Sequence, residues 1–364
     1  MHRTVQRFTR FLITGAVAAG LAPVVSAFTV VTVIVGANPN ALGVIPQTGE
    51  LAVVNSGTND VSIVDRETYK VSTVHAGSMP AAIAVNRTTG YAYVANSWDS
   101  TVTAIYGYGE GKKRKTYAVG AGAINVAVNG ATNRVYVVNN EDGTVTAIDE
   151  NTGATTTIPV GRRPRGIAVN EATNRIYVGN IWDGTVTVID GSTNSPVATV
   201  PVVAWAYDVV VNPLTNTIYV GSGDGWSVTV IDGATNATMD VSAGVWQPAF
   251  LAVNTVTNKI YAAGAQAGGG VMVIDGATNT ATAVATPPGP WGFNSLVSIK
   301  INEVTNRIYV ADSSSKNLLV IDGVTNELTL RPLDAEPCST AVDTSVSRVY
   351  LAHCGYTRIS ILTE

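Results

Sequence analysis

Pro164–Asn194 reads PRGIAVNEATNRIYVGNIWDGTVTVIDGSTN, and this stretch decides the fold because the rest of the chain consists of variants of it. It contains three runs rich in β-branched residues, Gly166–Val169, Arg175–Gly179 and Thr185–Ile189, separated by polar segments of Asn, Asp, Gly and Thr. Short runs with such boundaries are typical of antiparallel strands joined by tight turns. With a further run at Pro196–Val202, one unit is predicted to be a meander of four strands, A to D.

The unit recurs eight times along the chain. In each unit strand A ends at a position that is mostly asparagine, and a strand B residue follows seven positions later. That residue is aromatic in every unit but the first, and the series is Ala52, Tyr93, Tyr136, Tyr177, Tyr219, Tyr261, Tyr309 and Tyr350. A repeat of about 40–45 residues with four strands is typical of a β-propeller blade. The sequence therefore predicts an all-β, eight-bladed propeller.

The last unit lacks a strand D, because the chain ends at Glu364 directly after strand C. At the other end, Thr29–Gly36 reads TVVTVIVG and ends in Val-Gly, as do the strands D at 116–120 and 157–161. An open ring would leave blade faces without a neighbour to bury them. We therefore expect Thr29–Gly36 to complete the last blade and close the ring.

The first 27 residues have the composition of a secretory signal peptide, with three arginines, an apolar core over Phe11–Leu21 and small residues at 25–27. We expect cleavage after Ala27, a single propeller domain over 28–364, and a secreted, periplasmic or cell-surface protein. A retained membrane anchor is the alternative. No transmembrane segment is expected in the mature chain, which we expect to be monomeric.

The mature chain would keep 19 basic and 26 acidic residues. This low, mildly acidic charge argues against nucleic acid as a partner, because nucleic-acid binding favours basic stripes. Cys338 and Cys354 are the two cysteines, and an exported protein can keep them oxidised. The hairpin that contains them is predicted to be symmetric about residue 346, so that Val342 opposes Tyr350 and Cys338 opposes Cys354 in a cross-strand disulfide.

Three segments resemble the YVTN family of propeller repeats: NEATNRIYVGN (170–180), NPLTNTIYVGS (212–222) and NEVTNRIYVAD (302–312). The resemblance covers the whole mature chain. It implies a propeller fold and an exported setting, since the family is similar to bacterial and archaeal surface or periplasmic proteins. A related class resembles propeller lactonases and a lyase that acts on cyclic peptide antibiotics. The resemblance does not imply one activity, because propellers carry unrelated functions.

Most repeated residues are interpreted as structural. The aspartate that ends strand C stands in Asp-Gly-Ala/Ser-Thr-Asn, which is turn chemistry. The repeated tyrosine is interpreted as a packing residue between blades with its hydroxyl hydrogen-bonded. Regular amides follow strand B in the first four units, and we expect them to bond loop backbone: Asn55, Asn96, Asn139 and Asn180.

Function is expected where the copies differ, which is the face formed by the D–A and B–C connections. All six tryptophans map to this face, three in D–A connections and three in or beside B–C connections: Trp205, Trp246, Trp291, Trp98, Trp182 and Trp226. The opposite face is uniform turn sequence. The tryptophans either cap blade interfaces or form a ligand surface.

Charged and aromatic residues accompany them in the D–A connections of the fourth and fifth units: Arg163, Arg165, Tyr207 and Asp208. Clustered Trp, Tyr and Arg at a concave mouth suit a sugar, an aromatic or an anionic ligand. The sequence thus predicts a binding scaffold for a small molecule, a glycan or a protein.

The alternative is a propeller enzyme, of lactonase or lyase type, with its site on the same face. Its weak candidates are His353, which replaces the repeated asparagine, and Glu336 as a carboxylate within reach. A hydrogen-bonded loop histidine is the other interpretation of His353. No motif predicts a metal or a cofactor.

Overall fold

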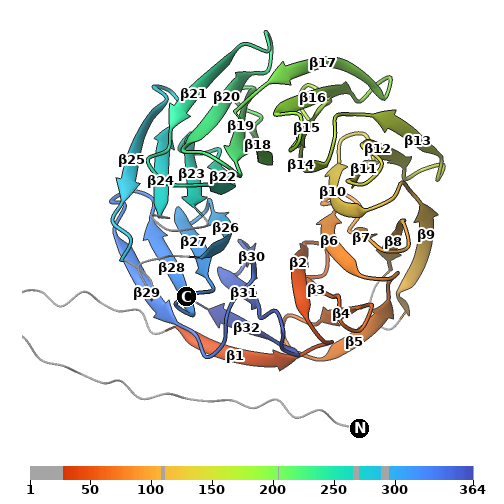
Figure 1. The fold of residues 1–364 in the computed structure, drawn as a ribbon. Helices are drawn as coiled ribbons and strands as arrows, with labels where there is room; N and C mark the ends of the chain where they lie inside the picture. The colour runs from red at the N-terminus through yellow and green to blue at the C-terminus, as the bar shows by residue number, and fades with distance from the viewer. Residues whose placement is uncertain (1–27, 108–110, 204, 265–269, 288–294, 364) are drawn as a thin grey trace, which may run out of the picture.

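The computed structural model describes residues 28–107, 111–203, 205–264, 270–287 and 295–363. Eight four-stranded antiparallel sheets stand around a common axis as the blades of a β-propeller (Figure 1). Each sheet runs from strand A at the ring centre to strand D at the rim. The predicted eight-bladed propeller is confirmed.

The strands below are given in the order of blades 1 to 8. Strand A is β2 (Pro39–Ile45), β6 (Pro80–Val85), β10 (Ala123–Asn129), β14 (Pro164–Asn170), β18 (Ala206–Asn212), β22 (Pro248–Asn254), β26 (Leu296–Asn302) and β30 (Ser339–Asp343). Strand B is β3 (Glu50–Asn55), β7 (Ala92–Asn96), β11 (Arg134–Asn139), β15 (Arg175–Asn180), β19 (Thr217–Ser222), β23 (Lys259–Gly264), β27 (Arg307–Asp312) and β31 (Arg348–Ala352). Strand C is β4 (Asp60–Val64), β8 (Thr101–Tyr106), β12 (Thr144–Asp149), β16 (Thr185–Asp190), β20 (Ser227–Asp232), β24 (Val271–Asp275), β28 (Asn317–Asp322) and β32 (Arg358–Thr363). Strand D is β5 (Val71–His75), β9 (Lys113–Ala118), β13 (Thr155–Pro159), β17 (Ser195–Pro201), β21 (Thr238–Ser242), β25 (Thr280–Val284), β29 (Leu328–Pro332) and β1 (Thr29–Ile34).

The ring closes through both ends of the chain. β1 pairs antiparallel with β32, with Thr29 opposite Thr363 and Ile34 opposite Arg358. Figure 1 shows β1 outside β32 as the outer strand of the last blade. Val33 of β1 is buried and packs in the cluster that joins the last blade to the first. The predicted closure is confirmed.

The core lies between neighbouring blades. Strands B and C are buried almost throughout, and Tyr219 of blade 5 packs in one cluster with Leu251 and Ile260 of blade 6. Burying a large aliphatic side chain contributes about 1.5–3 kcal/mol, so each interface adds stability only when its neighbouring blade is present. The repeated tyrosines are packing residues, as predicted.

The prediction for the tyrosine hydroxyls holds at Tyr136, which donates to Oδ1 of Asn194 at 3.4 Å, but not at others. Those of Tyr177, Tyr219 and Tyr261 are buried without a hydrogen-bond partner among the described residues. Burial raises the pKa of Tyr219 and of Tyr261 to about 12. Packing of the rings therefore outweighs hydrogen bonding of the hydroxyls at these positions.

The repeated polar residues are structural. At the end of strand C, Oδ1 of Asp232 accepts the backbone N–H groups of Ala234 and Thr235, and these bonds lower the pKa of that carboxyl. Asn180 donates from Nδ2 to the hydroxyls of Thr185 and Thr187 on strand C, at 3.1 and 2.9 Å. Its Oδ1 accepts the backbone N–H of Gly161 in the D–A loop at 3.1 Å, as expected. Asn55, Asn96 and Asn139 donate instead to side chains of strand C, which corrects the expectation at these three positions.

The disulfide Cys338–Cys354 is present, with the two Cα atoms 5.7 Å apart. The predicted register of its hairpin is wrong by one residue, because Ala341 opposes Tyr350 and Val342 opposes Val349. The cysteines are therefore offset by one position rather than directly opposed. The backbone N–H of Cys338 still bonds the carbonyl of Ala352 at 2.9 Å.

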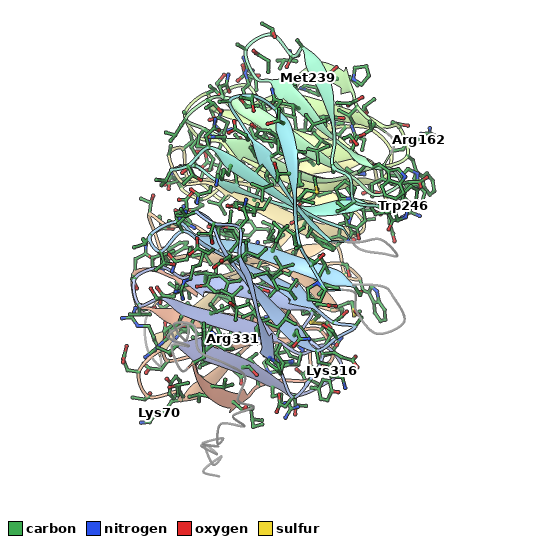
Figure 2. All side chains as sticks on the ribbon, turned by 90° about the vertical axis from the view of Figure 1, so that its left-hand side faces the viewer. Lys70, Arg162, Met239, Trp246, Lys316 and Arg331 are labelled. Carbon is green, nitrogen blue, oxygen red and sulfur yellow. A yellow bond between two sulfur atoms is a disulfide. The ribbon has the colours of Figure 1, made fainter. Side chains whose placement is uncertain are left out.

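The two faces of the ring differ in their connections. The D–A and B–C connections form one face, here the loop face; the A–B and C–D turns form the other, here the turn face. Figure 2 shows Arg162, Trp246 and Lys316 along one edge of the ring and Lys70 along the other. In the described part of the chain, no helix has the length and apolar character needed to span a membrane.

Candidate functional site

The residue directly before strand A has a left-handed backbone in blades 1 to 6. Five of these residues are not glycine: Asn38, Met79, Arg163, Trp205 and Gln247, with φ of 53°, 52°, 51°, 60° and 49°. Blade 3 has Gly122 there. A left-handed conformation costs a side chain other than glycine about 1–2 kcal/mol, and asparagine tolerates it best. Arginine and tryptophan at this position are therefore not explained by the local backbone.

A β-bulge at the start of strand A positions Arg165 and Tyr207. Strand A has a register shift near its start in blades 1 to 7, including Pro164 to Ile167 in blade 4 and Ala206 to Asp208 in blade 5. Such bulges re-aim side chains at the end of a strand. Arg165 and Tyr207 lie within these shifts. Each is the second residue of its strand, β14 or β18, and not part of a D–A loop as predicted.

Arg163 stacks on Trp182. Its guanidinium carbon lies 4.9 Å from the centre of the Trp182 ring, and its Nη1 donates to Oδ1 of Asn140 at 2.9 Å. Trp182 lies in the B–C loop of the same blade and is 59% exposed. The loops are held together by Asp183, which accepts the backbone N–H and the Nε–H of Arg162. The pair is therefore fixed in place yet open to solvent.

A second stack crosses three blades. The guanidinium carbon of Arg165 in blade 4 lies 4.1 Å from the centre of the Tyr207 ring in blade 5. Tyr207 in turn meets Phe250 of blade 6 edge to face, with ring centres 6.0 Å apart. Cation–π contacts of this kind contribute about 0.5–2 kcal/mol. Phe250 and Asn140 were not predicted as site residues, because their roles depend on contacts between blades.

Trp205, Trp226 and Trp246 lie on the loops of blades 5 and 6. Trp226 and Trp246 meet edge to face with ring centres 5.2 Å apart. Trp205 is 47% exposed and Trp226 is 49% exposed. Gly223 gives room beside them, because an added Cβ would lie 3.0 Å from Cδ2 of Tyr207 and 3.4 Å from Cβ of Trp205. We call Trp182, Trp205, Tyr207, Trp226, Trp246 and Phe250 the aromatic arc.

Trp98 is not counted in the arc. Trp98 is 78% exposed and occupies in blade 2 the loop position that Trp182 has in blade 4. Met79 precedes strand A there, where blade 4 has Arg163. Trp291 lies outside the described residues. Of the six predicted tryptophans, Trp226 and Trp246 are in contact with each other.

Asp208 is half-buried near the start of β18. Its Oδ1 accepts the N–H of Val209 and its Oδ2 accepts the N–H of Leu251 in blade 6, both at 2.9 Å. Burial raises the pKa of the Asp208 carboxyl, against the opposing effects of the Leu251 N–H and the charge of Lys300. Both oxygens are engaged, so Asp208 holds blade 5 to blade 6.

His353 has no exposed surface. Its Nδ1 contacts the backbone carbonyl of Glu336 at 3.2 Å, and its Nε2 contacts Oγ of Ser360 at 2.8 Å. Because a carbonyl only accepts, Nδ1 carries the proton and Nε2 accepts from the serine hydroxyl. The Glu336 carboxylate instead lies 3.6 Å from Lys316 on the surface. The geometry gives His353 the place of the repeated asparagine, which contacts the hydroxyl seven residues later.

The turn face is less uniform than its sequence predicts. Tyr69, Tyr91 and Tyr106 lie there, half-buried, and the rings of Tyr91 and Tyr106 stack with centres 5.1 Å apart. Exposed aliphatic side chains occupy equivalent A–B turn positions at Leu214, Val256 and Val304. No tryptophan of the described ranges lies on this face.

The fold and the loop face define an eight-bladed β-propeller with an aromatic arc over blades 4 to 6. No protein-family model matches this chain, and no curated protein does. Within the described ranges, no group of three or more His, Cys, Asp or Glu side chains is arranged to hold a metal ion.

Proposed function

We propose that this protein is an exported binding protein of the YVTN-repeat type, which captures its ligand on the aromatic arc of the loop face. The observation that carries the proposal is that aromatic side chains of blades 5 and 6 meet in two edge-to-face pairs, Tyr207–Phe250 and Trp226–Trp246. Two arginines of blade 4 lie beside them, Arg165 on the Tyr207 ring and Arg163 on the Trp182 ring. Trp182, Trp205 and Trp226 remain about half exposed or more. Rigid aromatic groups at a rim are the usual anchors of binding sites.

The experiment compares the two faces. Residues 28–364 are screened against a glycan and small-molecule array, and each hit is then measured with Trp182→Ala and Trp205→Gly. The glycine keeps the left-handed backbone, so the variant removes the ring without new strain. Leu214→Ala and Val256→Ala serve as matched controls, because these side chains are 75% and 73% exposed on the turn face.

Loss of an aromatic anchor is expected to cost about 2 kcal/mol or more of binding free energy. The controls should bind as the unmodified protein does. If the turn-face variants abolish binding while the tryptophan variants only lower the melting temperature, the tryptophans are caps on blade interfaces and the proposal is wrong.

Export is part of the proposal and rests on the composition of residues 1–27 and on the disulfide, which an oxidising compartment maintains. The exported protein is expected to begin at Phe28, which a measurement of its intact mass would show. A chain recovered with residues 1–27 attached would show that the segment is retained.

A catalytic role is not advanced. The ring of His353 is buried and both of its nitrogens are engaged. A general base needs a free acceptor within reach of its substrate, and this geometry does not favour one at His353.

A further inference from the structure

Two arginines of the loop face differ from many others in the described chain. Ion pairs with aspartate or glutamate are formed by Arg66, Arg134, Arg162, Arg175, Arg348 and Arg358. Arg163 and Arg165 do not pair with a carboxylate of the described chain, and each stacks on an aromatic ring instead. Both are on the loop face beside the aromatic arc. Among the described residues, neither guanidinium therefore has a carboxylate within ion-pair distance.

A third cation acts on the same carboxyl as Arg165. Lys300 extends from β26 at the inner side of blade 7 and is exposed. Its charge and that of Arg165 both act on the Asp208 carboxyl. That single carboxyl already accepts two backbone N–H groups. Other carboxylates lie on the same loops, because Asp183 pairs with Arg162, and Asp224, two residues before Trp226, is exposed. Arg163 and Arg165 differ from the other charged groups there in stacking on rings without an ion pair.

The stacked arginines are arranged to receive an acid group. A guanidinium that lies flat on a ring keeps the N–H groups at its edge free, and these match both oxygens of a carboxylate. The Arg163 Nη1 is held by Asn140, which fixes the orientation of the fork. Exposed tryptophan rings at Trp205 and Trp226 supply flat apolar surfaces on the loops of the next blade. Flat aromatic surface next to carboxylate-binding forks fits a sugar ring with an acid substituent.

We propose that the aromatic arc binds acidic oligosaccharides, with Arg163 and Arg165 receiving carboxylates of uronic acid residues. This inference rests on the proposed function and names its ligand class. A neutral sugar leaves two desolvated guanidinium groups unpaired, which costs binding energy. A nucleic acid calls for basic stripes along its backbone, whereas this region has three cations on an acidic protein.

The test uses a galacturonic acid hexasaccharide and its fully methyl-esterified form, which has the same sugar skeleton without the charges. Binding to residues 28–364 is measured by titration calorimetry. The acid is expected to bind at least about ten-fold more tightly than the ester, as charge-assisted bonds require. Arg163→Met and Arg165→Met should each weaken acid binding about ten-fold or more and leave binding of the ester unchanged.

Two matched controls separate a specific site from general charge. Arg163→Met reproduces the arrangement of Met79 beside the loop of Trp98 in blade 2, so the left-handed backbone is known to accept it. Arg162→Met removes a neighbouring cation that is 73% exposed and already paired with Asp183. It should leave the affinity for the acid unchanged.

Three results would overturn the inference: no binding of the acid, equal binding of acid and ester, or an equal effect of Arg162→Met and Arg163→Met. Tighter, Arg163-dependent binding of a single-stranded oligonucleotide would also overturn it, in favour of a different polyanion. If a neutral ligand binds in a Trp205-dependent way and the acid does not bind, only this inference fails. If tryptophan variants affect no ligand, the proposed function fails as well.

Discussion

Asn129, the last residue of β10, donates a hydrogen bond from Nδ2 to Oδ1 of Asn174 in the next blade, 2.8 Å away. Asn174 lies in the A–B turn of blade 4 with a left-handed backbone, at φ of 52°. The same contact joins the following pairs of blades, through Asn170–Asn216, Asn212–Asn258 and Asn254–Asn306, at 2.7 to 2.8 Å. One asparagine therefore ends strand A and the other turns the chain, and together they link successive blades.

Replacing Asn174 tests this link. Asn174→Ala removes the acceptor of Asn129 and places a Cβ without a compensating amide in the left-handed region. The lost hydrogen bond costs about 1 kcal/mol and the backbone about 1–2 kcal/mol. We expect the variant to lose about 2–3 kcal/mol of unfolding free energy in a denaturant titration.

Asn174→Gly is the control, because glycine loses the hydrogen bond and keeps the conformation. It should cost about 1 kcal/mol. Equal losses for alanine and glycine would mean that the left-handed conformation contributes nothing, and no loss in either would mean that the link between blades is not stabilising.

The fold was predictable because its determinants are local and repeated. The Thr-Asn turns, the buried strand B tyrosines and the Asp-Gly turns recur in step, and each is visible in the sequence. The closing strand could be assigned because TVVTVIVG ends as the other strands D do. Symmetry about residue 346 gave the wrong register for the last hairpin, because four turn residues separate Asp343 from its partner Arg348, as they separate Asn170 from Arg175 in blade 4.

The candidate site was predictable only as a list of residue types. The tryptophans and arginines could be placed on one face from their connections. The stacking of Arg165 on Tyr207, and of Arg163 on Trp182, depends on bulges and left-handed residues that bring different loops together. One sequence signal could have located the left-handed residues. A residue other than glycine stands directly before the proline that starts strand A, as in Met79-Pro80, Arg163-Pro164 and Gln247-Pro248.

Removal of the closing strand is expected to disrupt the whole ring. Deletion of residues 28–36 exposes the edge of β32 and the inner face of the blade that Val33 covers. We expect loss of the cooperative melting transition or self-association through the free edge. Circular dichroism melting and size-exclusion chromatography measure both.

A synthetic peptide of residues 28–36 provides the complementary measurement. Added to the truncated protein, it should pair with β32 and restore cooperative melting. Unchanged melting of the truncated protein without the peptide would show that β1 does not hold the ring closed.

The disulfide is expected to stabilise the last blade. Cys338 and Cys354 are 16 residues apart in the sequence, and closing a loop of this size contributes about 3 kcal/mol in the chain-entropy account. The double variant Cys338→Ser, Cys354→Ser should therefore melt at a lower temperature, by an amount that matches reduction of the native protein. Two free thiols in protein purified without reductant would contradict the bond itself.

Substitutions of His353 test whether this histidine is structural. Asparagine occupies the equivalent position in blades 1 to 4 and contacts the strand C hydroxyl seven residues later, as His353 contacts Ser360. His353→Asn should therefore change the unfolding free energy by less than about 1 kcal/mol at pH 7. His353→Ala leaves a cavity and an unpaired carbonyl at Glu336, and should cost about 2–4 kcal/mol.

The pH dependence gives an independent measurement. Burial lowers the pKa of His353 from the ordinary value of 6.5, so the folded protein binds this proton less tightly than the unfolded chain does. The stability associated with the neutral ring is complete above 6.5 and is lost as the pH falls from 6.5 through the lower pKa of the folded state. Melting temperatures of the native protein should therefore fall below those of His353→Asn on acidification. Parallel melting curves for the two proteins across this range would show that His353 is not held neutral by the fold.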